Sequence, residues 1–479
     1  MGWWWLLPLA AGLTGLRILW RQNIAASSRL AWVLVIVMLP LAGIALYLLF
    51  GEADLSRKRR ERAQGVEAAL AKAAKRQAAR RALPHGELDP LYSPAFAAAR
   101  SVNGFGVVGG NTAELMADAG EARRRLIEDI DAARHSVNVL YYIWLEDRTG
   151  TDVAQALIRA AQRGVTCRAM ADGLGSRAMV GSRLWADMKQ AGVKTVVALP
   201  LTNVLKTLAL SRIDLRNHRK ITVIDDAITY CGSQNCADEA FLVKKRFAPW
   251  VDIMVRLTGP VAMQSQLLFA TDWVLHTDDT LDMFEADAAP EVEPKDGGTR
   301  AVVWGDGPTS RKGVAQQLIS TLAAQARHRL TISTPYFVPG EVVLESICAA
   351  AHRGVEVSLI LPLRNDSWIV SAASRSNYNQ LLEAGVTIFE HSPGLLHSKT
   401  FVVDGMVGLI GSSNLDLRSF DLNYENNILF EDPELAAAIE ARQQSYIAAS
   451  RRKALEELTA ISIPKRIWHN IVATVGPVL

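Results

Sequence analysis

Two short segments of the chain place a histidine, a lysine and an aspartate at identical spacings. Residues 218–225 read His-Arg-Lys-Ile-Thr-Val-Ile-Asp, and residues 397–404 read His-Ser-Lys-Thr-Phe-Val-Val-Asp. A Gly-Ser-x-Asn segment follows each at the same distance, at residues 232–235 and 411–414. One copy would match by chance in roughly a few hundredths of chains this long. Two copies with the same trailing segment therefore predict a duplicated half-site that converges on one anion.

The local structure expected for each segment brings its side chains together. On a β-strand, residues two apart point to the same face. His218 and Lys220 should therefore project together, as should His397 and Lys399. A hairpin turn after each motif aspartate would return the Gly-Ser segment beside the lysine. Each half thus offers an imidazole, an ammonium group and neutral hydrogen-bond donors.

This set of groups suits phosphoryl or phosphatidyl transfer by double displacement. One neutral imidazole would attack phosphorus and form a phosphohistidine, while the opposite imidazolium protonates the departing alkoxide. As a coupled pair, one histidine could be neutral and the other charged near pH 7. The lysines, Asn235 and Asn414 would hold the phosphate oxygens, and Ser233 and Ser412 would add hydroxyl donors.

Other polar residues near the motifs could orient the imidazoles or serve only as helix-start residues. These candidates are Asp238, Glu239, Asp416, Arg418 and Glu425, of which we include Glu425 among the supporting site residues. Aromatic residues at matching strand ends could line the pocket or belong to the core; they are Tyr141, Tyr142, Tyr336 and Phe337. No carboxylate cluster or His/Cys spacing indicates a metal site, so we expect no metal and no cofactor. The four cysteines (Cys167, Cys231, Cys236 and Cys348) also show no metal-binding spacing.

Beyond about residue 100 the chain repeats one plan of helices and strands. In both copies, a helix that ends in Arg-His precedes a strand-like run, and a second helix ends in Arg-Gly before another β-branched run. Helices that end in Gly and alternate with short strands predict an α/β fold. We expect two lobes with mixed β-sheets flanked by helices, related by a pseudo-twofold axis.

The two copies differ in one place. The motif histidine follows the preceding Ala-Gly pair by 26 residues in the first copy and by 12 in the second. The additional residues fall within 199–216, which is apolar on one face and basic at its end. This insertion could be a membrane-facing flap or an ordinary surface helix. Residues 277–299 are rich in Asp, Glu, Ala and Pro, which is typical of a linker.

The N-terminal region is strongly apolar. Residues 3–20 carry only Arg17, and residues 30–50 carry no charge, which is long enough to cross a bilayer of about 30 Å. A secretory signal is disfavoured because a basic n-region is missing and a second apolar run follows. We therefore expect a hairpin of two transmembrane helices.

Residues 57–81 hold ten Lys or Arg and two Glu, a charge of +8 in a chain of net charge +3. By the positive-inside rule, this places the remainder of the chain in the cytoplasm. The basic helix could lie on anionic headgroups or be a solvated linker. The expected organisation is a transmembrane hairpin (1–52), a basic juxtamembrane helix and linker (53–100), lobe 1 (101–276), a linker (277–299) and lobe 2 (300–479).

The paired His-x-Lys-x4-Asp motifs resemble those of the phospholipase D superfamily. More narrowly, the chain resembles the bacterial cardiolipin synthases. The likeness includes residues 39–52, 142–144 (Tyr-Ile-Trp), 214–220 (Asp-Leu-Arg-Asn-His-Arg-Lys), 334–339 (Thr-Pro-Tyr-Phe-Val-Pro), 360–362 (Ile-Leu-Pro) and 411–419 (Gly-Ser-Ser-Asn-Leu-Asp-Leu-Arg-Ser).

The resemblance implies transfer of a phosphatidyl group from one phosphatidylglycerol to another at the bacterial cytoplasmic (inner) membrane, with the lobes facing the cytoplasm. It implies that His218 and His397 are nucleophile and general acid, with His218 favoured as nucleophile. It also implies that the catalytic set comprises Lys220 and Lys399 as phosphate ligands and Asp225 and Asp404 as the ends of the motifs.

Three other classes of function are compatible with some of these sequence features. A phospholipase D-type hydrolase, or a phosphatidyltransferase with serine or ethanolamine as acceptor, would use the same catalytic residues. A nuclease is disfavoured because residues 82–479 have an acidic balance and nucleic-acid binders usually carry a basic surface. An inactive membrane scaffold is disfavoured because all six motif positions are intact. The expected partners are therefore phosphatidylglycerol and membrane lipids, and no nucleic acid.

Overall fold

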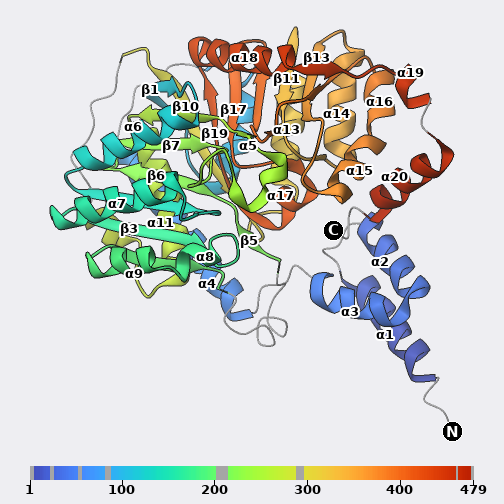
Figure 1. Ribbon diagram of the computed structural model, residues 1–479, viewed down its shortest axis with the longest axis horizontal. Coiled ribbons are helices and arrows are strands. Elements are labelled where there is room, and N and C mark those ends of the chain that lie inside the picture. The colour runs from blue at the N-terminus through green and yellow to red at the C-terminus, as the bar shows by residue number, and fades with distance from the viewer. Residues whose placement is uncertain are drawn as a thin grey trace.

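The computed structural model of the chain describes residues 5–21, 26–51, 57–80, 88–200, 214–286, 296–459 and 462–475. It shows a mixed α/β protein in which two similar lobes share one twisted sheet (Figure 1). Lobe 1, in cyan to green, and lobe 2, in yellow to red, meet where β1 pairs antiparallel with β10. The expected fold class of the two lobes is confirmed.

The strands of lobe 1 run in the order β4-β3-β2-β6-β7-β9-β1. Their bounds are β1 Val108–Leu115, β2 Ser136–Tyr141, β3 Thr166–Asp172, β4 Lys194–Ala198, β6 Lys220–Ile224, β7 Ile228–Gly232 and β9 Met254–Thr258. The β2-β3-β4 part is parallel and the β2-β6-β7-β9-β1 part is antiparallel. The helices of this part of the chain are α5 Ser93–Asn103, which packs on β10 and α13 of lobe 2, and α6 Ala119–Ala132, α7 Arg148–Gln162, α8 Arg177–Val180, α9 Arg183–Gln190, α11 Val261–His276 and α12 Asp282–Ala286.

Lobe 2 repeats this order as β14-β13-β11-β16-β17-β19-β10, with β20 added outside β14. Its strands are β10 Thr299–Asp306, β11 Arg329–Ser333, β13 Glu356–Pro362, β14 Thr387–His391, β16 Thr400–Val403, β17 Val407–Gly411, β19 Asn423–Glu431 and β20 Ser450–Arg452. Its helices are α13 Val314–Gln325, α14 Glu341–His352, α15 Trp368–Ser376, α16 Tyr378–Glu383, α17 Leu417–Asp421, α18 Pro433–Ala448, α19 Glu456–Thr459 and α20 Ile463–Val475. Equivalent strands pair with the same polarity in both lobes.

The glycines after the second helix of each copy have the conformation that ends a helix. Gly164 follows α7 with φ of 91°, and Gly354 follows α14 with φ of 88°. This left-handed conformation suits glycine, which has no Cβ to clash. The chain can therefore reverse directly into β3 and β13, whose side chains are mostly buried between the helical layers.

Two very short parallel strand pairs connect the lobes at the pseudo-twofold axis. β5 (Arg216–Asn217) of lobe 1 pairs with the start of β19 of lobe 2. β15 (Leu395–Leu396) of lobe 2 pairs with β8 (Trp250–Val251) of lobe 1. We call these pairs the inter-lobe bridges. A third short pair, β12 (Phe337–Val338) with β18 (Leu415–Asp416), lies within lobe 2.

The expected transmembrane hairpin is not observed. The apolar region forms three short helices, α1 Leu6–Trp20, α2 Ala26–Met38 and α3 Pro40–Phe50. The run expected to be one helix over residues 30–50 breaks at Leu39, because Pro40 begins a new helix and its ring cannot continue the preceding one. Within the described residues, none of the helices is both long and apolar enough to cross a membrane.

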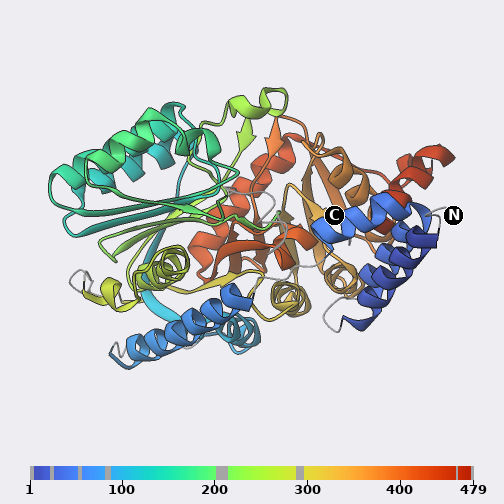
Figure 2. The same ribbon diagram turned by 90° about the horizontal axis from the view of Figure 1, so that it is seen from below.

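The basic segment forms a helix, α4 Arg57–Arg80, that packs on lobe 1. Leu70, Ala73 and Ala74 are buried in the main core, and Arg62 donates to the carbonyl oxygen of Val274 at 2.8 Å. Figure 2 shows α4 along the lower face of this lobe, whereas α1–α3 lie together at the other end of the molecule. One stripe of α4 thus serves the fold, which makes it more than the solvated linker considered above. Most of the 199–216 insertion, and residues 287–295 of the 277–299 linker, lie outside the described residues.

Candidate active site

The inter-lobe bridges place each motif histidine beside an acidic residue of the other lobe. His218 follows β5, and its backbone amide donates to the carbonyl oxygen of Tyr424 at 2.9 Å. His397 follows β15, and its amide donates to the carbonyl oxygen of Val251 at 2.9 Å. In a parallel pair the next residues along both chains face each other. The bridges therefore align His218 with the residue after Tyr424, and His397 with the residue after Val251.

Those two residues are carboxylates. Nδ1 of His218 lies 2.9 Å from Oε2 of Glu425, and Nδ1 of His397 lies 2.6 Å from Oδ1 of Asp252. All four side chains are buried or nearly so. A carboxylate at Nδ1 fixes the hydrogen on that nitrogen and leaves the Nε2 lone pair free. Each imidazole is thus oriented by the opposite lobe.

Sequence reasoning included Glu425 and missed Asp252. Asp252 lies 19 residues after Ser233, whereas Glu425 lies 13 residues after Ser412. The first copy inserts the short helix η2 (Leu242–Phe247) in between, so the acidic residue does not repeat at a fixed offset. The available signal is an aromatic residue one or two positions before the acid, as in Trp-Val-Asp and Tyr-Glu.

The two motif serines contact these carboxylates. The Ser233 hydroxyl donates to Oδ1 of Asp252 at 2.6 Å and accepts from the Ile253 amide. The Ser412 hydroxyl donates to Oε2 of Glu425 and accepts from the Asn426 amide. Their hydroxyl groups are therefore engaged in holding the carboxylates, a different arrangement from the phosphate donors expected above.

The two motif asparagines are tied to the protein in different ways. Oδ1 of Asn235 accepts from the Ile143 amide at 3.2 Å. Nδ2 of Asn414 donates to the Ser419 hydroxyl at 3.2 Å, and its Oδ1 is a buried atom for which the structure shows no hydrogen-bond partner. The two copies thus share the contact between histidine and carboxylate, but the side-chain amides of Asn235 and Asn414 make different hydrogen bonds.

The lysines lie directly beside the histidines. Nζ of Lys220 donates to the carbonyl oxygen of His218 at 2.8 Å, and Nζ of Lys399 donates to that of His397 at 2.6 Å. Burial lowers the pKa of Lys220 to about 8 and that of Lys399 to about 7, against the attraction of Glu425 and Asp252. The ammonium groups are therefore poorly solvated, which strengthens their attraction for an anion.

The ionisable groups of the two halves influence one another. Burial lowers the pKa of both His218 and His397 to about 4, and each is also lowered by the lysine of the other lobe. Burial opposes ionisation of Glu425 and Asp252, but contacts with the histidines and lysines outweigh it and lower the pKa of both carboxyls. The protein alone favours two neutral imidazoles at pH 7, whereas the sequence suggested one neutral and one charged.

Aromatic rings flank the imidazoles. The Tyr142 ring centroid lies 4.8 Å from that of His218, and the Trp250 ring centroid lies 4.5 Å from that of His397. The Tyr142 ring centroid also lies 5.7 Å from Nζ of Lys220. Tyr142, one of the aromatic residues singled out in the sequence, thus borders the site, and the wall beside His397 is a tryptophan instead.

The motif aspartates lie away from the histidines. Asp225 and Asp404 follow β6 and β16, at the opposite ends of these strands from the lysines. Asp225 accepts from the backbone amides of residues 134–136, and Asp404 from those of residues 327–329 and from the Tyr92 hydroxyl. In the structure these aspartates hold the helix-to-strand turns that precede β2 and β11, and their place in the catalytic set stays a prediction.

Replacing Asp404 with alanine should therefore destabilise the protein far more than it impairs its chemistry. The change removes the acceptor of three amides and a hydroxyl at a residue with φ of 53°, for a loss of about 2–4 kcal/mol. Asp404→Asn keeps one acceptor oxygen and tolerates this conformation better, so it is the matched control. Thermal unfolding and the turnover of the folded fraction would check this. A turnover loss as large as that of a histidine variant would contradict it.

The other polar candidates serve local structure. Asp238 accepts from the amide and hydroxyl of Thr149 at the start of α7, and Asp416 accepts from the Ser419 amide at the start of α17. Arg418 donates to Asp214. Glu239 contacts Trp250 through its backbone, since its carbonyl oxygen accepts from that amide at 2.9 Å.

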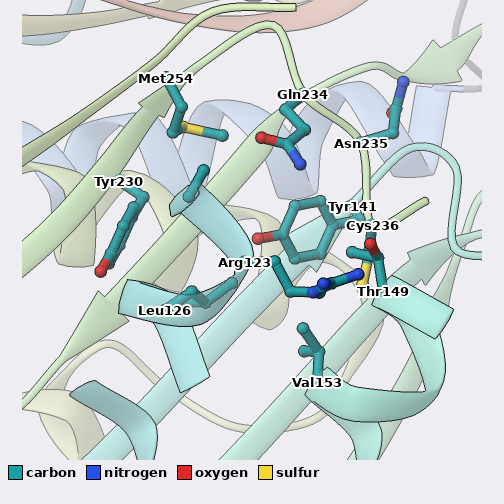
Figure 3. A pocket seen from close by; sticks show the side chains of 11 residues that line it. Arg123, Leu126, Tyr141, Thr149, Val153, Tyr230, Gln234, Asn235, Cys236 and Met254 are labelled. Carbon is teal, nitrogen blue, oxygen red and sulfur yellow. The ribbon is translucent and has the colours of Figure 1, made fainter. Parts of the chain in front are cut away.

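A small cavity of about 20 Å³ lies beside the first motif (Figure 3). Tyr141, Tyr230, Gln234 and Cys236 line it, and Figure 3 shows the Asn235 amide directed away from it. This volume accommodates about one water molecule, so the cavity belongs to the packing behind the site. In the described part of the chain, no three His, Cys, Asp or Glu side chains are grouped to hold a metal ion.

Comparison with known proteins agrees with this geometry. A family model described as "Cardiolipin synthase, PLD-like domain" matches residues 126–268 and 319–447, one segment in each lobe. A model described as "Phospholipase D-nuclease N-terminal" matches residues 14–52.

Named relatives span nearly the whole chain. Cardiolipin synthase A of Klebsiella pneumoniae (strain 342) is 38% identical over 98% of this chain and 95% of its own. Cardiolipin synthase A of Escherichia fergusonii is 37% identical over the same shares. The crystal structure of phosphatidylserine synthase from Haemophilus influenzae Rd KW20 shares the fold, with a TM-score of 0.57 and 18% identity over 77% of this chain and 95% of that one. The chain belongs to the family of cardiolipin synthases with phospholipase D-like domains.

Proposed function

We propose that the protein synthesises cardiolipin by transferring a phosphatidyl group from one phosphatidylglycerol to another, with release of glycerol. The observation that carries the proposal is the pair of buried imidazoles at one inter-lobe site, each held by a carboxylate of the other lobe and accompanied by a lysine. Membership of the cardiolipin synthase family supports the identity of the donor and acceptor lipids.

In the first half-reaction, Nε2 of one histidine attacks phosphorus of the donor lipid. A P–N bond forms, the P–O bond to the glycerol headgroup breaks, and the opposite imidazolium gives its proton to the departing oxygen. In the second, that imidazole, now neutral, takes the proton from a glycerol hydroxyl of another phosphatidylglycerol. The new P–O bond forms as the P–N bond breaks. We favour His218 as the nucleophile and His397 as the acid and base.

The electrostatics of the site fit an anionic substrate. A phosphodiester has a negative charge, which raises the pKa of imidazole and ammonium groups beside it. The substrate itself would therefore favour protonation of His397 and keep Lys220 and Lys399 charged. The ionised Glu425 and Asp252 stabilise the imidazolium at the moment it is needed.

The direct test is incubation of the purified protein with phosphatidylglycerol labelled in its headgroup glycerol. We expect one glycerol released for each cardiolipin formed, since two lipids combine with loss of one headgroup. The His397→Ala protein is the control for contaminating enzymes. Phosphatidic acid as the sole product would refute the proposal and assign a hydrolase that uses water as acceptor.

The stability of the protein should fall as the pH falls from 6.5 towards 4. Both site histidines have a folded-state pKa of about 4 against an ordinary 6.5, so the unfolded chain binds more protons over this interval. Each pKa unit is worth about 1.4 kcal/mol, so the pair contributes several kcal/mol above pH 6.5. Melting temperatures should show this slope, and His218→Gln combined with His397→Gln should flatten it. An unchanged slope would contradict it.

We further propose that α1–α3 contact membrane lipids and keep the lobes on the cytoplasmic side of the bacterial inner membrane. Their outer side chains are largely apolar and exposed, among them Leu13, Leu16, Trp20 and Leu41. The ten basic residues of the following segment suit the anionic surface of the cytoplasmic leaflet.

A further inference from the structure

The last helix, α20, has one apolar face against the protein and a second one in solvent. Val472 is buried near α15, with Ala372 and Ala373 of that helix. On the outer side, Ile463, Ile467 and Ile471 are 72%, 53% and 52% exposed at a spacing of four residues. Residues four apart share one face of a helix. The helix therefore presents a stripe of isoleucines that the chain itself leaves uncovered.

A pair of tryptophans extends this stripe. Trp468 of α20 stacks on Trp368, the first residue of α15, with ring centroids 5.7 Å apart and an angle of 19° between the planes. Both rings are largely exposed. Exposed tryptophans beside an apolar stripe are characteristic of surfaces that enter the headgroup region of a bilayer.

A contact between the lobes joins the segment before the tryptophan pair to η2, which precedes the tryptophan beside His397. Asp366, two residues before Trp368, accepts a hydrogen bond from the Tyr336 hydroxyl at 2.7 Å and forms an ion pair with Lys244 of η2. Shortly after η2 the chain reaches Trp250, which lies against the His397 ring. The exposed surface therefore begins within a few residues of the imidazole.

This surface carries exposed basic residues on η2 and α20. Lys245 and Arg246 of η2 are exposed, as is the neighbouring Val243, and Arg466 is exposed on α20. Asp366 is almost fully buried and engaged by Lys244. Exposed isoleucine and tryptophan together with Lys and Arg match the surface of an anionic bilayer in both polarity and charge.

The apolar N-terminal helices lie on the same side of the molecule. In both Figure 1 and Figure 2, α20 lies on the side of the molecule where α1–α3 are found. Those helices expose many apolar side chains of their own. A single planar partner can therefore contact α1–α3 and α20 together.

We propose that α20, the Trp368–Trp468 pair and η2 form a docking surface for an anionic phospholipid bilayer, which presents lipid headgroups to the inter-lobe site. This inference rests on the proposed function, since it concerns how a bilayer-resident substrate reaches the histidines. The exposed isoleucines and tryptophans and the basic residues beside them favour a membrane over a protein partner.

The test places a fluorescent label on α20 of the full-length protein. Binding of the whole protein to vesicles would not report on α20, because α1–α3 could hold the protein there without it. All four native cysteines are buried, so Ile467→Cys gives a selectively reactive thiol for an environment-sensitive label. On vesicles of phosphatidylglycerol we expect a blue shift and a roughly threefold rise in emission, as the probe enters about 5–10 Å below the headgroups. Brominated acyl chains should quench it.

The matched control is Met283→Cys, which is also exposed. Met283 lines a hollow with Gly164 and Cys167 at the beginning of β3. The other end of this strand faces the site, since Asp172 accepts from the Asn217 amide next to His218. A label at position 283 should therefore remain unquenched on the same vesicles.

A charge test separates the bilayer from other occupants. Lys245→Glu with Arg246→Glu should weaken docking about tenfold, seen as a smaller emission change at each fraction of phosphatidylglycerol. Lys189→Glu with Lys194→Glu, also exposed, should leave it unchanged.

Two results would overturn the inference: a probe at position 467 that stays unshifted on vesicles, or one that shifts without vesicles as protein concentration rises, which would indicate a second copy of the chain. Because the readout does not use turnover, it is independent of cardiolipin formation in detergent micelles. A protein that makes cardiolipin while its probe stays unshifted would disprove the docking surface and leave the proposed function standing. A protein whose probe shifts on vesicles but that makes no cardiolipin would support the docking surface and disprove the proposed function.

Discussion

Replacing either His218 or His397 with alanine is expected to lower cardiolipin formation by about 10⁴-fold or more, and replacing both should lower it little further. With phosphatidylglycerol, loss of His218 removes the nucleophile and loss of His397 removes the acid that the glycerol leaving group needs, so either change blocks the first step. Groups that act as a unit give strongly non-additive losses. Steady-state turnover of labelled phosphatidylglycerol would measure this, with melting temperatures confirming that the variants fold. Near-full activity in either variant would disprove the two-histidine mechanism.

A substrate with a good leaving group separates the two roles. When p-nitrophenol replaces the glycerol headgroup, its departure needs no proton. The His397→Ala protein should then release about one equivalent of p-nitrophenol in a burst and retain a phosphatidyl adduct, whereas His218→Ala should release none. The opposite pattern would assign the nucleophile to His397.

The second large effect is expected from the carboxylates across the lobe boundary. Asp252→Asn and Glu425→Gln should each lower turnover by about 10²–10⁴-fold with little change in volume. An amide can present its NH₂ group to Nδ1 and favour the wrong tautomer, and it does not stabilise the imidazolium. Asp238→Asn is the matched control, because Asp238 belongs to the same sequence region but contacts the start of α7.

Combined variants would show which histidine each carboxylate serves. Asp252→Asn should add little to the loss caused by His397→Ala, because its partner is already absent. The same holds for Glu425→Gln in the His218→Ala background. Equal, fully additive losses within a pair would contradict the contacts that the structure shows.

Much of this architecture could be predicted because it depends on local periodicity. The two-residue spacing predicted that His218 and Lys220 lie together, and the Lys220 ammonium does donate to the His218 carbonyl oxygen, although His218 lies between β5 and β6. Helix-ending glycines mark the repeat of strands and helices. The lobes and the pairing of His and Lys follow from such short-range rules. Asp252 could not be found in this way, because its distance along the chain from the motif differs between the copies and its partner lies 145 residues away.

The structure places two features differently from what the sequence suggested, for physical reasons. The family resemblance grouped the motif aspartates with the catalytic residues, but β6 alone spans about 17 Å at roughly 3.3 Å per residue. Asp225 therefore lies at the far end from His218. The N-terminal apolar run over residues 30–50 suggested one long helix, but hydropathy does not register the break that Pro40 introduces.

The inter-lobe bridges have a consequence for how the chain can be divided or altered. Each half of the molecule holds a histidine whose orienting acid belongs to the other half, so neither half produced alone would contain a complete acid–imidazole pair. Two separately expressed halves could regain activity only by associating through β5 with β19 and β15 with β8. Selection should therefore act on the pairs jointly. A substitution at position 252 alters the orientation of His397, and a substitution at position 425 alters that of His218. The two repeats of the sequence therefore depend on each other for a complete site and should evolve together.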